Sequence, residues 1–281
     1  MGKGDDPNGG AGGAATLTVA SSSSALAAER IAADNPNISA ARLASLPAEI
    51  DAVLSRPCLN GKQVLFLHVG GSMSYGLAHD ESDLDVRGAY LADPLTLMGM
   101  DRPSDQLEDR AYDLVAYELR KFLWLTAIKA GPQQLECLYS SPLTCSPEGD
   151  LVLAHRDQFL SQQARATYAG FAMGNMRDLE RNETTGTMSP AKRAKTIRHL
   201  FRLMEQGTHL LAAGEMQVKV TDPARYERWE QAPFERIAAH WQTLDEQLQT
   251  VPSVLPDQAD MRMINDLLVQ IRLQALDARR S

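Results

Sequence analysis

The sequence predicts an α+β protein of 281 residues whose strands are confined to its first half. Residues 64–69 (VLFLHV) form a continuous apolar run of strand length, and two more strand-like segments follow at 83–91 and 112–117. Beyond about residue 150 the strand signals almost vanish. The stretches 151–180, 190–213 and 258–278 have the composition and period of helices. We therefore expect a mixed first half and an all-helical second half.

Composition divides the chain into three expected regions. Residues 1–24 hold six of the 19 glycines and a run of four serines, so they bury little apolar surface and are expected to form a disordered tail. Residues 25–148 contain the strand signals and are expected to form the domain that holds the functional site. Residues 149–281 are expected to form a helical C-terminal domain.

Charge and cysteine content exclude several classes of protein. The chain has 28 Lys and Arg against 36 Asp and Glu, and a net charge of −8 disfavours coating of nucleic acid by bulk charge. The three cysteines have no CxxC spacing, which argues against a zinc site or a disulfide framework. No window approaches 18 consecutive apolar residues, and no signal-peptide pattern begins the chain. We expect a cytoplasmic protein without a membrane contact.

The most informative segment joins a glycine turn to two carboxylates. The first apolar run leads into Gly71-Ser72, and ten residues later Asp83 and Asp85 open the next strand-like segment. Side chains alternate along a strand, so Asp83, Asp85 and Arg87 are expected on one face. The intervening apolar residues are expected to point into the core.

Two carboxylates at this spacing favour a divalent cation. At a separation of 4 Å and an effective dielectric constant near 20, like charges repel by about 4 kcal/mol. A cation such as Mg²⁺ removes this repulsion and takes its remaining ligands from water and nucleotide phosphates. Glycine allows a phosphate to approach the backbone closely, so Gly71 and Ser72 are candidate phosphate-binding residues. The sequence thus predicts a metal-nucleotide site.

Gly71-Ser72, ten residues and Asp83-x-Asp85 resemble the nucleotidyltransferase signature of the DNA polymerase beta superfamily. More narrowly, residues 71–91, 113–125 and 195–215 are similar to the RNA repair pathway DNA polymerase beta family, and the resemblance covers about residues 63–275. It implies a mixed sheet backed by helices and two Mg²⁺ ions, with Mn²⁺ as the alternative. It also implies transfer of a nucleoside monophosphate from an NTP, with pyrophosphate leaving.

The resemblance implies a third carboxylate on a neighbouring strand. Asp113 is the match, since it shares strand parity with Val115 and Tyr117, whereas Glu118 has the other parity and begins a helix. Glu118 stays in reserve. The candidate catalytic residues and metal ligands are Asp83, Asp85 and Asp113, and the candidate nucleotide-binding residues near them are Gly71, Ser72 and Arg87.

A basic helical face interrupts the acidic chain. Between Met188 and Arg202 there are five Lys or Arg and no Asp or Glu. The polar positions recur at spacings of three and four, which places them within about 100° of one helix surface. A stripe of positive charge alone favours binding of triphosphate or of an RNA backbone, and an ordinary solvated surface is the alternative. The candidate binding residues on this face are Lys192, Lys195, His199 and Arg202.

The leading functional hypothesis is an NTP-dependent nucleotidyltransferase whose acceptor is an RNA 3′ end, such as that of a tRNA. One alternative is nucleotidylation (AMPylation) of a protein hydroxyl in an antitoxin-like role. Another is a catalytically silent module that binds nucleotide or a partner through the same cleft. The apolar helices at 200–211 and 261–276 also allow a homo-oligomer.

Overall fold

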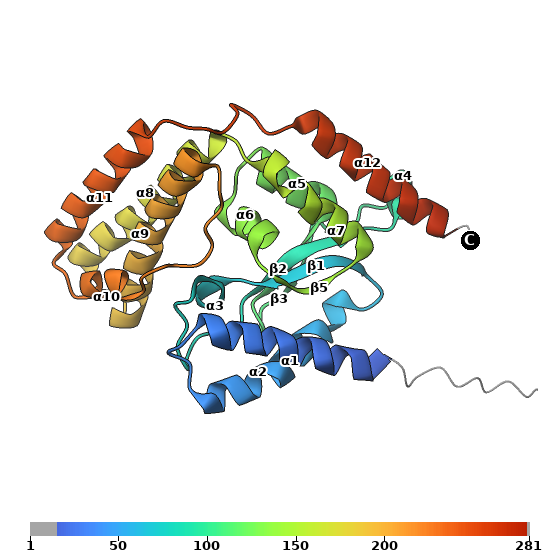
Figure 1. Cartoon of the computed structure of the whole chain (residues 1–281), viewed down its shortest axis with the longest axis horizontal. Coiled ribbons are helices and arrows are strands. Elements are labelled where there is room, and N and C mark those ends of the chain that lie inside the picture. The colour runs from blue at the N-terminus through green and yellow to red at the C-terminus, as the bar shows by residue number, and fades with distance from the viewer. Residues whose placement is uncertain (1–15, 280–281) are drawn as a thin grey trace, which may run out of the picture.

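The computed structural model describes residues 16–279 as a five-stranded mixed sheet with helices on both faces and a helical C-terminal part (Figure 1). The strands are β1 (Gln63–Val69), β2 (Val86–Leu91), β3 (Gln106–Asp109), β4 (Leu114–Glu118) and β5 (Pro142–Cys145). Their order is β3-β4-β2-β1-β5, with β2 and β4 parallel and the other neighbours antiparallel. The predicted α+β class is confirmed.

Helices cover the two faces of the sheet in separate layers. Figure 1 shows α1 (Thr16–Asp34) and α2 (Ala40–Leu54) on one side. On the other side lie α5 (Leu119–Ala127), α6 (Pro132–Tyr139) and α7 (Pro147–Ala154). Strand β1 supplies both cores: Phe66 contacts Phe122 of α5 at 5.2 Å between ring centroids, whereas Leu67 joins the cluster of α1 and α2. This alternation explains the continuous apolar run, because both faces of the strand are buried.

Helix α1 corrects the expected extent of the N-terminal tail. Residues 16–24 were expected to belong to a disordered tail but lie in α1, and residues 1–15 lie outside the described part of the chain. Ala27, Ala28 and Ile31 are buried in the core that α1 shares with α2, and Ser24 donates a hydrogen bond to Asp51 at 2.5 Å. A helix nucleated by this packing extends toward its N-terminus at little further cost, which composition alone does not reveal.

The strands also differ from expectation at their ends. Strand β2 begins at Val86 rather than at residue 83, and β4 begins at Leu114 rather than at 112. The four-residue strands β3 and β5 were not predicted, because segments this short show no alternation pattern above background. The short helical elements are α3 (Gly71–Tyr75), α4 (Pro94–Met98) and the 3₁₀ turns Pro57–Leu59 and Arg156–Phe159.

From residue 149 to 279 the structure contains helices and no strand, as predicted. The helices after α7 are α8 (Gln163–Thr185), α9 (Pro190–Ala213), α10 (Ala224–Glu230), α11 (Phe234–Thr250) and α12 (Met261–Ala278). Helices α8 to α11 form one lobe, and α12 returns to lie over α5 (Figure 1). No helix in the described residues is both long and apolar enough to cross a membrane.

One hydrophobic cluster extends across the expected domain boundary at 148/149. It contains Leu65 of β1 and Phe122 of α5 together with Leu210 of α9 and Ile271 of α12. Sheet and helical lobe therefore share a core, and the division into two domains stays a prediction.

Candidate functional site

A cleft of about 940 Å³ lies between the sheet and helix α9. Its walls come from the turn after β1, the segment before β2, the residue before β4, α6 and the first half of α9. It contains all ten leading candidates from the sequence: Gly71, Ser72, Asp83, Asp85, Arg87, Asp113, Lys192, Lys195, His199 and Arg202. Segments more than 100 positions apart in the chain thus meet in one cavity.

The segment before β2 alternates as predicted. Asp83 is exposed, Asp85 and Arg87 are half-buried, and the intervening Leu84 and Val86 are buried. The carbonyl of Asp85 accepts a hydrogen bond from the amide of Gly70 at 2.8 Å, which ties this segment to the turn after β1. Both aspartates line the cleft, although they precede the strand rather than lie in it.

Gly71 is required where it stands. Its φ is +62°, in the left-handed region that side chains disfavour. A Cβ at this position would lie 1.8 Å from Oδ2 of Asp85 and 2.9 Å from its Cγ. The Asp85 carboxylate therefore rests directly on the glycine, and the turn positions the carboxylate.

Asp113 completes an acidic pair from the neighbouring strand. Its carbonyl accepts a hydrogen bond from the amide of Val86 at 3.2 Å, and its φ of +42° turns the chain into β4. The guanidinium of Arg87 donates to Oδ1 of Asp113 at 2.8 Å and lies 3.8 Å from Oδ1 of Asp85. Arg87 thus lies against both carboxylates.

The two carboxylates hydrogen-bond to each other. Burial raises the pKa of Asp85 to about 7, and the hydrogen bond and charge of Asp113 add to the rise. The same hydrogen bond, followed by the charge of Arg87, lowers the pKa of Asp113. Two carboxylates this close repel each other when both are ionised, and a proton or a divalent cation would relieve that repulsion.

The residues present fit a hard divalent cation at this pair. Among residues 16–279, no group of three or more His, Cys, Asp and Glu side chains is arranged to hold a metal ion. Asp85 and Asp113 form an adjacent oxygen pair, and exposed Asp83 lines the same cleft. Paired carboxylates with open positions are the donor set that Mg²⁺ prefers. Asp83 stays a predicted ligand.

Glu118, the reserve candidate, lies outside this group. It caps the N-terminus of α5 by accepting from the amide of Arg120 at 2.7 Å, and its other oxygen accepts from Arg272 at 3.1 Å. It is buried and does not line the cleft. The geometry therefore favours Asp113 as the third carboxylate.

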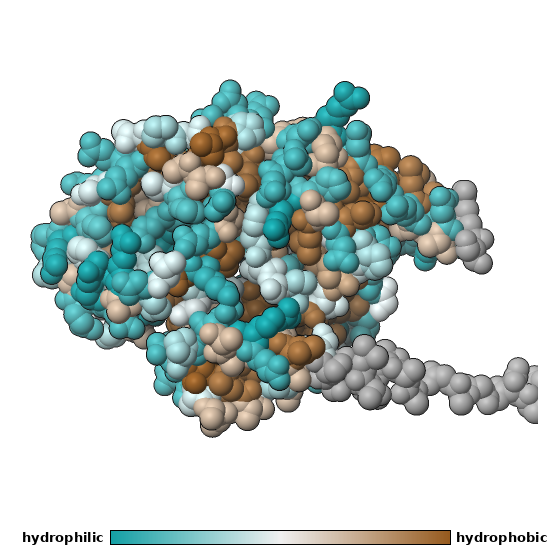
Figure 2. All heavy atoms as spheres, in the orientation of Figure 1, coloured by the Kyte–Doolittle hydropathy of each residue, from teal (hydrophilic) through white to brown (hydrophobic). Residues whose placement is uncertain are grey.

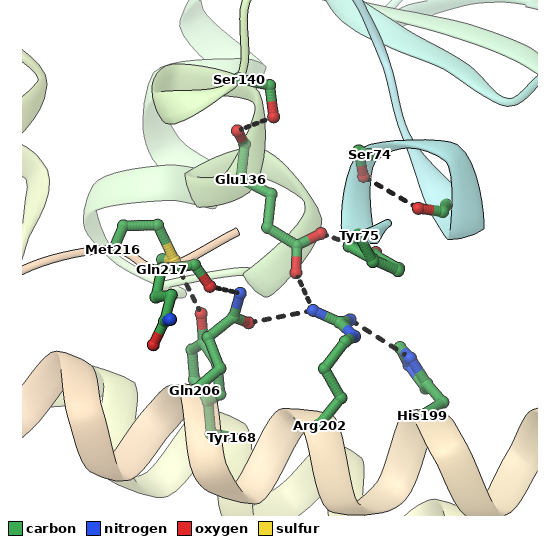
Figure 3. Close-up of polar contacts among 11 residues, drawn as sticks. Ser74, Tyr75, Glu136, Ser140, Tyr168, His199, Arg202, Gln206, Met216 and Gln217 are labelled. Carbon is green, nitrogen blue, oxygen red and sulfur yellow. Dashed lines mark hydrogen bonds and ion pairs between the residues drawn. The ribbon is translucent and has the colours of Figure 1, made fainter. Parts of the chain in front are cut away.

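The basic face of α9 divides into an exposed and a buried part. Lys192 and Lys195 are exposed at the cleft. Arg202 is 3% exposed and donates to Oε1 of Glu136 at 2.6 Å, with its guanidinium 3.6 Å from the ring centroid of Tyr75 (Figure 3). We expected Arg202 to contact phosphate, but its charge is already paired with Glu136. The exposed positive charge of the face comes from the two lysines.

The comparison with protein families gives a match over residues 44–270, which is most of the chain. The matched family is the RNA repair pathway DNA polymerase beta family. The chain belongs to this family. Its description supports a polymerase-beta-type nucleotidyltransferase in an RNA repair pathway, and the matched range includes every residue of the cleft discussed above. Neither the curated proteins nor the solved structures gave a match.

Tyr75 and Glu136 also line the cleft and were not predicted. Glu136 is buried in α6, where it accepts from the hydroxyl of Tyr75 at 2.8 Å as well as from Arg202. The partners stand 61 and 66 positions away, so no local spacing indicates them. The one available signal is a carboxylate between Leu135 and Cys137 of α6. A charge in that context requires a partner.

On α9, His199 lies between Lys195 and Arg202. Its Nδ1 is 3.3 Å from Nη2 of Arg202. Burial, followed by the charges of Arg202 and Lys195, lowers its pKa from 6.5 to about 3. Within this cleft the imidazole is therefore neutral at physiological pH.

Proposed function

We propose that this member of the RNA repair pathway DNA polymerase beta family is a metal-dependent nucleotidyltransferase that moves a nucleoside monophosphate from an NTP to an acceptor hydroxyl. The observation that supports this most strongly is the Asp85–Asp113 pair, which interacts electrostatically with Lys195 across the cleft. An acidic wall that takes a metal and a basic wall that takes phosphate together suit a metal-bound triphosphate.

In this proposal the acidic wall of the cleft holds the metal ion. Asp83, Asp85 and Asp113 would hold Mg²⁺, or Mn²⁺ in its place, and the ion supplies neutralisation of phosphate charge when it is bound. Arg87 keeps the carboxylate of Asp113 in one orientation through their 2.8 Å hydrogen bond.

The remaining residues bind the triphosphate. Lys192 and Lys195 balance its charge and that of the departing pyrophosphate. The Gly71-Ser72 turn lines the same cleft and would offer its amides to the phosphates.

The acceptor that we favour is an RNA 3′ end, since the family is described as part of an RNA repair pathway. A protein hydroxyl is the second candidate, because a net charge of −8 disfavours extended contact with RNA. A catalytically silent binding module is disfavoured, since all three aspartates and the glycine beneath Asp85 line the cleft.

Incubation with α-phosphate-labelled NTPs, total RNA and total protein separates these candidates. We expect Mg²⁺-dependent label in RNA, abolished by EDTA and reduced at least 100-fold in Asp85→Asn and Asp113→Asn. The matched control is Asp178→Asn, which removes an exposed carboxylate of α8 and should leave transfer unchanged. Label in protein would favour the second acceptor. Full activity in both site variants would contradict the proposal.

A further inference from the structure

The hydrogen bond between Arg202 and His199 determines which imidazole nitrogen holds the proton. Nη2 of Arg202 lies 3.3 Å from Nδ1 of His199, and Figure 3 shows the two side chains side by side on α9. A guanidinium has only donors, so Nδ1 must be the acceptor. The proton of a neutral ring then resides on Nε2.

The guanidinium that imposes this arrangement is itself held in place. Its Nη1 donates to Glu136 of α6 at 2.6 Å and contacts Oε1 of Gln206 at 3.3 Å. Its plane lies over the ring of Tyr75 of α3, with 3.6 Å to the ring centroid. Turning Arg202 away would leave the buried carboxylate of Glu136 unpaired, which is costly, so the guanidinium has one favourable orientation.

The environment also keeps His199 neutral. Burial and the cations Arg202 and Lys195 on its own helix lower its pKa to about 3. The opposing charges of other elements that line the cleft are Glu136, paired with Arg202, Glu230, paired with Arg198, the Asp85–Asp113 pair, which holds Arg87, and the exposed Glu81 and Asp83. The ring therefore presents the same single donor throughout the physiological pH range.

We propose that Arg202 is a positioning residue that locks His199 in the Nε2–H tautomer, so that His199 offers a neutral donor to a phosphate oxygen in the cleft. His199 lines the cleft one helical turn from Lys195. A lysine attracts phosphate without preferred direction, whereas an imidazole N–H adds a directional contact. The tautomer follows from contacts within the chain, and the identity of the ligand rests on the proposed function.

Nitrogen NMR of the free protein tests the tautomer. In protein labelled with ¹⁵N-histidine, His199→Gln identifies the His199 signals. We expect Nδ1 to have the shift of an unprotonated ring nitrogen and Nε2 that of a protonated one. A protonated Nδ1, or signals averaged between both tautomers, would overturn the assignment. The unmodified protein decides this point, so it does not depend on whether a variant folds.

Arginine variants test the positioning role. Arg202→Lys keeps a cation for Glu136 but removes the Nη2 donor that contacts His199. We therefore expect His199 signals that are averaged between the two tautomers. Arg198→Lys is the matched control: Arg198 lies on the same helix and pairs with Glu230, not with His199. Its His199 signals should equal those of the unmodified protein. An unchanged His199 tautomer in Arg202→Lys would contradict the positioning role of Arg202.

Substitution of His199 tests the donor. His199→Gln keeps an N–H at a similar distance from the backbone, whereas His199→Phe keeps a ring without a donor. We expect the KM for ATP with Mg²⁺ to be about fivefold higher in His199→Phe than in His199→Gln, as for one net hydrogen bond. Equal KM values would overturn the donor role. Absence of any nucleotide transfer by the unmodified protein would contradict the proposed function but not the tautomer, which the spectrum decides separately.

Discussion

At the scale of single residues, the site depends on a glycine that supports a carboxylate. The positive φ of Gly71 and the 1.8 Å between its virtual Cβ and Oδ2 of Asp85 leave no room for another residue. The sequence predicted the glycine as a phosphate-binding turn. Its second task, support for Asp85, could not be predicted, because it depends on how the segment before β2 crosses the turn.

Substitution of Gly71 by alanine should therefore abolish function while the protein stays folded. We expect Gly71→Ala to displace the Asp85 carboxylate and reduce transfer at least 100-fold, with a backbone cost of about 1 kcal/mol. Gly186→Ala is the matched control: its φ is +60°, but nothing lies within 4 Å of its virtual Cβ. Transfer assays and thermal unfolding of both variants check this. Equal activity in the two variants would show that the contact with Asp85 does not matter.

The pKa of His199 predicts how stability depends on pH. It falls from 6.5 to about 3 on folding, chiefly through burial, so the unfolded chain binds the proton first as pH drops. The contribution of neutral His199 to the free energy of unfolding is complete above pH 6.5. It is lost as the pH falls toward 3, by up to about 1.4 kcal/mol per pH unit. His199→Gln removes this term. The variant's unfolding free energy, measured in urea at pH 7.5 and pH 5, should decrease less than that of the unmodified protein, and an identical decrease would contradict the assignment.

At the scale of elements, α9 connects the helical lobe to the cleft. Its 3.6-residue pattern predicted a helix with a polar face, and that helix runs over the predicted residues. The pattern did not reveal that Arg202 and Gln206 are buried on this face, since their partners lie on other elements: Glu136 of α6 binds Arg202, and the carbonyl of Gln217 accepts from Gln206. Periodicity shows which residues share a face but not what lies against it.

Removal of Glu136 should destabilise the protein strongly. Glu136→Ala leaves the guanidinium of Arg202 buried without its carboxylate, which costs about 3–5 kcal/mol. Asp178→Ala breaks an ion pair whose side chains are 55% and 70% exposed, and its cost should be about 0–1 kcal/mol. Urea unfolding of the two variants measures the difference. Similar losses would show that the buried pair does not join α6 to α9.

At the scale of the whole molecule, the cleft lies where the sheet meets the helical lobe, and a shared core holds the two together. The sequence predicted the strand-rich and helical halves, but not that one cluster extends across residue 148. Figure 2 shows a mostly hydrophilic face over α10 and α11, with hydrophobic side chains grouped on α12, where Val269 and Leu273 are exposed. The homo-oligomer that the apolar helices allow stays untested.

The most direct test of the central claim is to ask which phosphate of the nucleotide reaches the acceptor. NTPs labelled at the α or at the γ phosphate are incubated with RNA and Mg²⁺, with Asp85→Asn in parallel. The account predicts that only α label enters the acceptor, and that Asp85→Asn transfers at least 100-fold less. Transfer of γ label, or α transfer that persists in Asp85→Asn, would contradict it.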